Sequence, residues 1–137
     1  MIINQKVRLL ALGVLTASLL TMISCSRLRS SRTLSSKKAS SGTISANPNP
    51  IQVCDASGLG VTKLSWDAVG PNRVEVRLSS PDGVLFAQTV PTGTAETGKW
   101  VADGMTFYLQ DVSAGKPLTA ENTLAITTVK VTTTGCP

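Results

Sequence analysis

Residues 60–78 constrain the fold more than any other stretch, because they contain two alternating apolar and polar runs joined by a turn rich in Gly, Pro and Asn. Side chains alternate between the two sides of a strand, so Leu64 and Trp66 share one face of the first run. Val74, Val76 and Leu78 share one face of the second run. The stretch therefore predicts two long strands whose apolar faces begin a common core.

The remaining runs predict an all-β fold with about seven strands and no helix. Asp-Gly turns at residues 82–83 and 103–104 separate several of them, and residues 91–98 have the composition of a long polar loop. About 90 residues follow the N-terminal segments, which is the size of one β-sandwich. The other strand-like runs cover residues 51–54, 84–90, 105–111 and 123–134.

Residues 1–25 have the pattern of an export signal, since Lys6 and Arg8 precede an uncharged run over residues 9–26. The sequence Met-Ile-Ser-Cys near the end of this run resembles the lipobox of a bacterial lipoprotein signal. In that motif a cysteine follows a small residue, and an aliphatic residue stands three positions before it. The resemblance implies that Cys25 is lipidated, becomes the first residue of the mature chain and holds it on a membrane of the cell envelope.

Two features depart from the lipobox pattern and keep two alternatives open. Met22 stands where leucine is usual, and Arg27, Arg29 and Arg32 soon follow the cysteine, where positive charge opposes translocation. An uncharged run of 18 residues is just long enough to cross a bilayer, so an uncleaved signal anchor is the second reading. The third reading is cleavage at another position, which releases a secreted protein.

Residues 26–47 predict a disordered tether, and the folded module is expected at residues 48–137. The tether contains eight serines and five Lys or Arg, with no apolar period, so it cannot bury enough surface to offset its ordering entropy. Residues 1–45 carry seven basic and no acidic side chains, whereas residues 46–137 carry six basic and eight acidic ones, a difference of −2. Because the positive charge lies outside the module, a nucleic-acid partner is not expected.

The cysteine count predicts one disulfide bond. If Cys25 carries lipid, Cys54 and Cys136 remain, and an even pair in an exported chain is read as a bridge. This bridge would join the two ends of the module. A metal pair or a catalytic thiol would need further ligands or a base, and the chain contains no histidine. We expect no enzymatic activity, no metal and no cofactor.

The central strands also resemble a known family of modules. Residues 61–66 with the inward Trp66, residues 74–78 and residues 107–109 resemble the second, third and sixth strands of fibronectin type III and related immunoglobulin-like modules. The resemblance implies a sandwich in which the third, sixth and seventh strands share a sheet. No cysteine pair lies on the second and sixth strands, so recognition of the antigen-receptor type is not implied.

Such a sheet would place several outward side chains on one face, with Tyr108 as a shallow platform for a sugar or a peptide side chain. An ordinary solvated sheet face is the plainer interpretation. Trp100 either closes one end of the core or offers a second stacking surface. The candidate ligand-binding residues are Glu75, Arg77, Tyr108, Gln110, Lys130 and Trp100.

The last strand-like run changes phase, because Leu124 and Ile126 have one parity and Val129 and Val131 the other. A strand that keeps all four side chains inward needs an extra residue, so we expect a β-bulge near Thr127.

Two functions remain open. The first is a non-enzymatic module, anchored on the membrane, that binds an envelope polysaccharide or protein. The second is a structural spacer or an envelope-assembly lipoprotein without a small ligand. A patterned surface patch favours the first, and an evenly polar surface favours the second.

Overall fold

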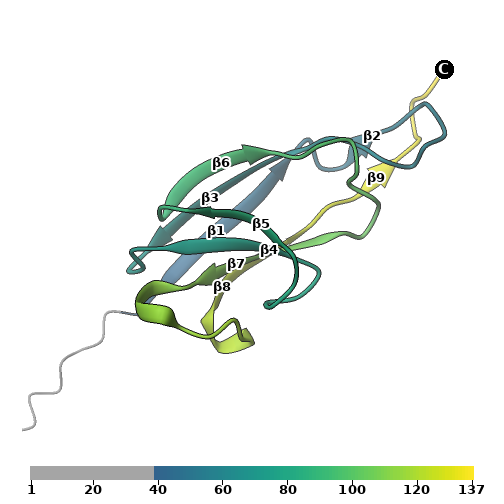
Figure 1. Ribbon diagram of the computed structural model, residues 1–137. Coiled ribbons are helices and arrows are strands. Elements are labelled where there is room, and N and C mark those ends of the chain that lie inside the picture. The colour runs from purple at the N-terminus through teal and green to yellow at the C-terminus, as the bar shows by residue number, and fades with distance from the viewer. Residues whose placement is uncertain (1–38) are drawn as a thin grey trace, which may run out of the picture. The chain divides into compact units, whose positions relative to one another are not determined.

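A computed structural model describes residues 39–137, and these residues form a β-sandwich (Figure 1). One sheet has the strand order β1-β3-β6 and the other β5-β4-β7-β8, all antiparallel, and β2 and β9 form a short parallel pair. The strands are β1 (Ser41–Asn47), β2 (Ile51–Gln52), β3 (Lys63–Val69), β4 (Val74–Leu78), β5 (Leu85–Thr89), β6 (Thr92–Glu96), β7 (Thr106–Asp111), β8 (Thr123–Thr128) and β9 (Val131–Thr132). Two single 3₁₀ turns, η1 (Ser113–Gly115) and η2 (Ala120–Asn122), connect β7 to β8.

The all-β prediction is confirmed, and so is the predicted sheet that unites the third, sixth and seventh runs, which are β4, β7 and β8. The core forms where the sequence pattern places it. Leu64, Val74 and Val76 are fully buried, and Trp66 is 4% exposed. Phe107 and Leu109 of β7 complete this core from the four-stranded sheet. The predicted export signal and Cys25 lie outside the described residues.

The first strand corrects the predicted boundary between the tether and the module. Residues 41–47, predicted as disordered, form β1 and pair along all seven residues with β3. Small side chains are required here, because a Cβ atom on Gly42 would lie 3.0 Å from side-chain atoms of both Leu109 and Leu124. Gly42, Ile44 and Ala46 do alternate with period two, but their little apolar surface hid the signal.

The predicted polar loop at residues 91–98 is also wrong, because residues 92–96 form β6. This strand lies against the core tryptophan, and a Cβ atom on Gly93 would come within 2.7 Å of the Trp66 ring. Glycine is therefore the residue that lets the strand pass over the indole. In the sequence this glycine suggested a loop, but in the fold its lack of a side chain is required for packing against Trp66.

The β-bulge expected near Thr127 is not found there. The ladder between β7 and β8 is regular from Thr106 and Thr128 to Leu109 and Ala125, and its one register shift lies beside Leu124. Ile126 is 54% exposed and points outward. The phase changes because the chain leaves the ladder after Thr128, and Val129 then enters the core at the start of the path to β9.

The chain crosses from one sheet to the other between β1 and β2. The β1 ladder ends at the pair of Asn47 and Lys63, and Ile51 then pairs with Val131 of β9. Asn49 fixes this crossover, since its side-chain amide donates to the Thr128 carbonyl at 3.0 Å and its oxygen accepts the Lys130 N–H at 2.9 Å. The residues that precede Lys63 in the chain are therefore not paired with β1.

Candidate functional site

Four of the predicted ligand-binding residues do come together on the outer face of the four-stranded sheet. Glu75 lies opposite Gln110, and Arg77 lies opposite Tyr108, in the ladder between β4 and β7. Their outward direction confirms the strand phase inferred from the sequence.

Burial and hydrogen bonding make this face a poor ligand surface. Glu75 is 6% exposed and Gln110 is fully buried. The Glu75 carboxylate accepts hydrogen bonds from the Arg77 guanidinium, which is also its ion-pair partner, and from the Gln88 side chain at 2.8 Å. Gln110 donates to the Thr123 hydroxyl. These polar groups bind one another, so most of their hydrogen-bonding capacity is used within the fold.

The other two predicted residues lie elsewhere. Lys130 follows the end of β8, where the ladder has stopped, so it does not belong to this sheet face. Trp100 precedes β7 and packs against the core, with its ring centroid 5.9 Å from Phe86 and 6.3 Å from Phe107. Its exposed fraction is 36%, so it covers the edge of the core and keeps part of its ring in solvent.

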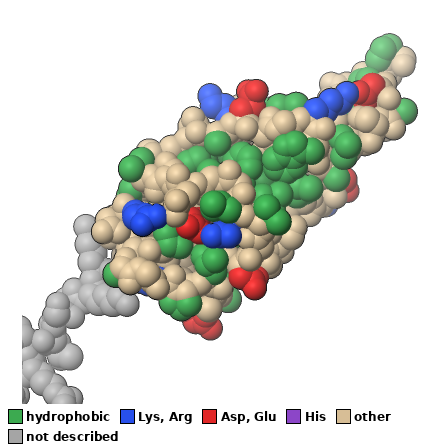
Figure 2. Space-filling view, in the orientation of Figure 1, with side chains coloured by type: hydrophobic (Ala, Val, Ile, Leu, Met, Phe, Trp, Pro, Cys, Tyr) green, Lys and Arg blue, Asp and Glu red, His purple; other side chains and the backbone are tan. Residues whose placement is uncertain are grey.

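The visible face of the sandwich is unevenly apolar (Figure 2). Several acidic and basic side chains lie next to one another on this face, and a larger apolar area lies toward the end where β2 and β9 are found. The same end contains an open hollow. The sequence analysis did not identify this hollow as a site.

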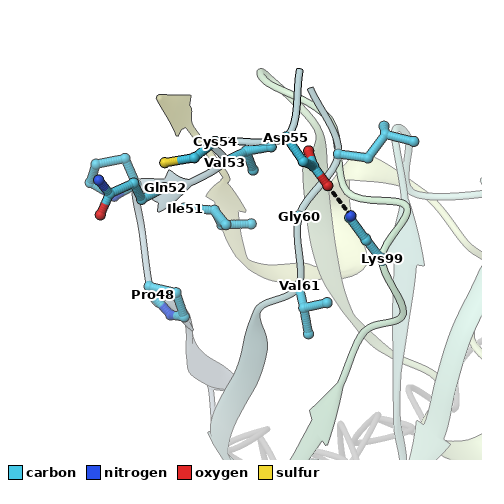
Figure 3. A pocket seen from close by; sticks show the side chains of 11 residues that line it. Pro48, Ile51, Gln52, Val53, Cys54, Asp55, Gly60, Val61 and Lys99 are labelled. Carbon is cyan, nitrogen blue, oxygen red and sulfur yellow. Dashed lines mark hydrogen bonds and ion pairs between the residues drawn. The ribbon is translucent and has the colours of Figure 1, made fainter. Parts of the chain in front are cut away.

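The hollow is an open groove of about 850 Å³ between β2 and the segment before β3 (Figure 3). Its volume is in the range of ligand-binding pockets. Ile51 points from β2 toward Gly60, where a Cβ atom would come within 2.4 Å of the isoleucine side chain. The apolar lining consists of Pro48, Pro50, Ile51, Val53, Leu59 and Val61.

The exposed wall formed by residues 59–61 is apolar, but one end of the groove carries an ion pair. Leu59 and Val61 keep exposed fractions of 37% and 38%. At the end, Lys99 and Asp55 form an ion pair (Figure 3). Hydrogen bonds from Lys99 and then from Ser57 hold the pKa of the Asp55 carboxyl far below its usual range. The two charges cancel, so the groove itself is nearly neutral.

The groove follows from the crossover of the first strand. If β1 continued past Asn47, it would lie beside residues 59–61 and fill this space; the chain instead turns at Pro48 toward β9. The Thr62 hydroxyl holds the turn by donating to the Pro48 carbonyl at 2.8 Å. The Asn-Pro-Asn-Pro motif at residues 47–50 was the available sequence signal, but it indicates only an extended chain and not where that chain goes.

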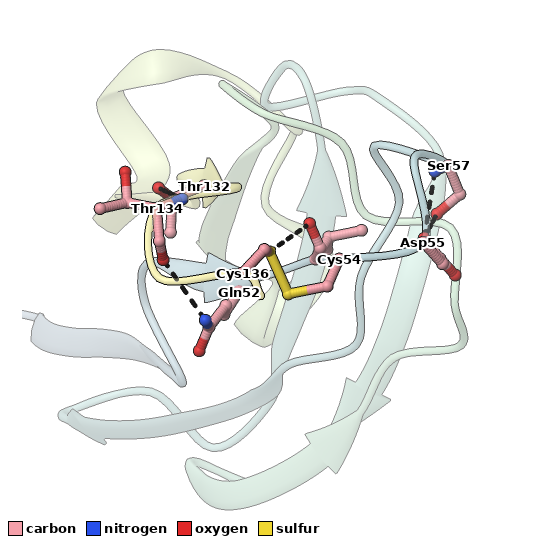
Figure 4. Close-up of a disulfide and its surroundings, with 8 residues drawn as sticks. Gln52, Cys54, Asp55, Ser57, Thr132, Thr134 and Cys136 are labelled. Atoms are coloured by element: carbon pink, nitrogen blue, oxygen red, sulfur yellow. Dashed lines mark hydrogen bonds between the residues drawn. A yellow bond between two sulfur atoms is a disulfide. The ribbon is translucent and has the colours of Figure 1, made fainter.

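A disulfide bond closes this end of the module (Figure 4). Cys54 and Cys136 are bridged, with their Cα atoms 5.4 Å apart, as the sequence predicts. Cys54 lines the groove, and the Gln52 side chain donates to the Thr134 carbonyl at 3.3 Å. The bridge therefore fastens one wall of the groove to the C-terminal segment.

A second polar cluster lies at the other end of β1, where the described chain begins. Asp111 is 1% exposed, forms an ion pair with Lys116 and accepts the Ser113 N–H at 3.0 Å. Burial raises the pKa of the Asp111 carboxyl, but hydrogen bonds from Lys116, Ser113 and Ser40 outweigh it, so the pKa is lowered. Through Ser40, this cluster fixes the start of β1.

Neither cluster is a group that could hold a metal ion. Within residues 39–137, no group of three His, Cys, Asp or Glu side chains is placed to hold a metal ion. No helix in the same range is long and apolar enough to cross a membrane. Comparison with protein-family models, with curated proteins and with solved structures finds no match. The groove itself is therefore the observation from which function is argued.

Replacing both cysteines, as Cys54→Ser with Cys136→Ser in a Cys25→Ser background, should lower the free energy of unfolding by about 4 kcal/mol. The bridge closes a loop with a sequence separation of 82, and its loss restores conformational entropy to the unfolded chain. Urea denaturation with and without a thiol reductant measures this. The reductant should destabilise the Cys25→Ser protein and leave the triple variant unchanged. Equal stability of the two proteins would contradict the role given to the bridge.

Asp111→Asn should lower stability by about 2 kcal/mol at pH 7, because it leaves Lys116 without its partner in a partly buried site. Since folding lowers the Asp111 pKa, its stabilising contribution is present above the unfolded pKa of about 3.9 and is lost as the pH falls through the folded value. Urea midpoints between pH 7 and pH 2.5 should therefore fall less steeply for the variant below pH 4. Glu96→Gln, on the exposed edge of β6, is the matched control and should follow the native curve.

Proposed function

We propose that this chain is a non-enzymatic binding module of the bacterial cell envelope. In this proposal residues 1–25 direct export, lipid on Cys25 holds the chain on a membrane, and the sandwich is an immunoglobulin-like module related to fibronectin type III. Its ligand, an envelope protein or polysaccharide, binds in the groove between β2 and residues 59–61. The sequence favoured the outer face around Tyr108 as the ligand-binding site. That face is the weaker candidate, because its polar groups bind one another.

The position of the groove carries this proposal. The chain enters the sandwich at Ser41, and the groove begins where β1 ends, at Asn47. Seven strand residues at about 3.4 Å each separate the two points by roughly 24 Å. An attachment at the beginning of β1 would leave the groove at the far end of the module, open to ligands away from the membrane.

The groove's chemistry supports binding rather than catalysis. Its lining is mostly apolar, and its one charged pair, Asp55 and Lys99, is internally neutralised. A general base or nucleophile needs a side chain that is free to exchange a proton or to attack. Apolar walls with few polar groups favour a ligand held by burial and by hydrogen bonds.

The alternative is a structural spacer without a ligand. The paired polar groups on the outer sheet face are compatible with it, because Glu75, Arg77, Gln88 and Thr123 bind groups of the same face, although the Gln110 side-chain oxygen is buried without a partner among the described residues. The two functions differ in one measurable property, which is saturable binding to envelope material.

Cys25→Ser should move the protein from the membrane fraction to the soluble fraction, because it removes the lipid-bearing thiol. Fractionation of bacteria that express the full chain, with mass spectrometry of the N-terminus, measures this. Membrane association that survives the change, together with an uncleaved N-terminus, would support the signal anchor. Release of the native chain into the medium would support secretion.

Leu59→Lys combined with Val61→Lys should weaken binding of the full-length chain to isolated envelopes at least about tenfold, because two charges would be placed in an apolar groove. Both side chains are already partly exposed, so the fold should tolerate the change. Val84→Lys, at a position that is 74% exposed and outside the groove, is the matched control and should bind normally.

Two other outcomes would redirect the proposal. Binding lost on Tyr108→Ala but kept in the groove variant would move the site to the outer sheet face. Absence of saturable binding by the native chain would favour the spacer.

A further inference from the structure

The groove contains an unpaired piece of strand edge, and it lies at Val61. Gly60 exchanges both of its backbone hydrogen bonds with Val101, at 2.9 and 3.2 Å. Because successive peptide groups in an extended chain point to opposite sides, the N–H and C=O of Val61 point the other way, toward the groove. Among residues 39–137, neither group has a hydrogen-bond partner.

The opposite wall presents a second edge. The N–H groups of Ile51 and Val53 donate to the carbonyls of Lys130 and Thr132, at 2.8 and 2.9 Å, so these residues point their peptide groups toward β9. The peptide groups of Gln52 therefore point away from β9. Gln52 also lines the groove, together with the apolar side chains of Ile51 and Val53.

We propose that the ligand of this groove is an extended peptide segment of a partner protein, added as a short strand against Val61. The inference rests on the proposed binding function and names its ligand class. Strand addition uses backbone hydrogen bonds for affinity and side-chain pockets for selectivity, and the groove offers both. The added strand continues the ladder that β1 forms with β3, in the position that the crossover leaves empty.

The groove also specifies the side chains of the peptide. Alternate residues of an added strand face the same side, so apolar residues at alternating positions meet Leu59 and Val61. Lys63 stands two residues from Val61, on the same side of its strand, is exposed and has no ion pair among the described residues. Asn47 already pairs with the Lys63 backbone, so a strand running in the direction of β1 begins beside Val61, with its amino end next to the Lys63 side chain. This position favours an acidic residue at the amino end of the peptide.

A positional peptide library tests this with the full-length chain. The probes are acetylated pentapeptide amides with Glu or Lys at position 1, mixtures of the apolar amino acids at positions 3 and 5, and Thr at positions 2 and 4. Titration calorimetry and amide chemical shifts of the protein measure binding. We expect the Glu pools to bind more tightly than the Lys pools by several-fold, with the largest shifts at Gln52, Gly60 and Val61.

Backbone pairing is tested by methylating single peptide nitrogens in the best binder. Methylation of the nitrogen that pairs with the Val61 carbonyl should weaken binding about tenfold, whereas methylation of the next nitrogen, on the opposite edge of the added strand, should have a smaller effect. Lys63→Glu should reverse the preference between Glu and Lys pools. Ser65→Glu, two residues further along the outer face and beside β1, is the matched control and should leave the preference unchanged.

Each other outcome overturns the inference. Equal tolerance of methylation at every nitrogen would mean that side chains alone hold the peptide. Failure of all pools, while isolated polysaccharide binds in the groove, would replace the peptide by a sugar and leave the binding function standing. Failure of all pools with concentration-dependent self-association that Leu59→Lys abolishes would make a second copy the occupant. Absence of saturable binding to envelopes as well would remove the binding function itself.

Discussion

The path of the first strand between the two sheets determines the rest of this module. β1 forms one edge of the first sheet while it pairs with β3, and after Asn47 the chain leaves that sheet and pairs with β9 through β2. The transfer requires a chain that leaves one ladder and turns toward another, and Asn49 holds the turn through its side-chain hydrogen bonds to the Thr128 carbonyl and the Lys130 N–H. The groove, the position of Cys54 beside the C-terminus and the exposed edge at Val61 all follow from this transfer.

Most of the successful sequence prediction came from the alternation of apolar and polar residues along single strands. Leu64, Trp66, Val74 and Val76 were assigned to the core from parity alone, and burial agrees with each assignment. Strands with small inward residues were missed, because Gly42 and Gly93 contribute no apolar surface to a periodicity. Each of these glycines is fixed by a side chain on another strand, which the local sequence does not contain.

The candidate site was predictable only in part, and the reason is long-range pairing. The outward direction of Glu75 and Gln110 followed from strand phase, but their burial depends on partners that come from other strands, Gln88 and Thr123. The disulfide could be inferred from the number of cysteines alone, without knowing how the strands pair. The groove was not inferred, since it is a space left between segments, and no motif of its lining residues indicates a space.

The ladder between β1 and β3 also determines how the module would respond to a pulling force. Tension arriving from the N-terminal side enters at Ser41 and acts along the axis of β1, while an opposing load at the groove acts near Val61, beyond the far end of the same ladder. The cross-strand hydrogen bonds lie perpendicular to that axis, so they are loaded together in shear and not opened one after another. Beyond the ladder, the bridge between Cys54 and Cys136 joins the groove wall covalently to the C-terminal segment. A load carried through the groove would therefore have to break seven residue pairs at once before β1 could slide free.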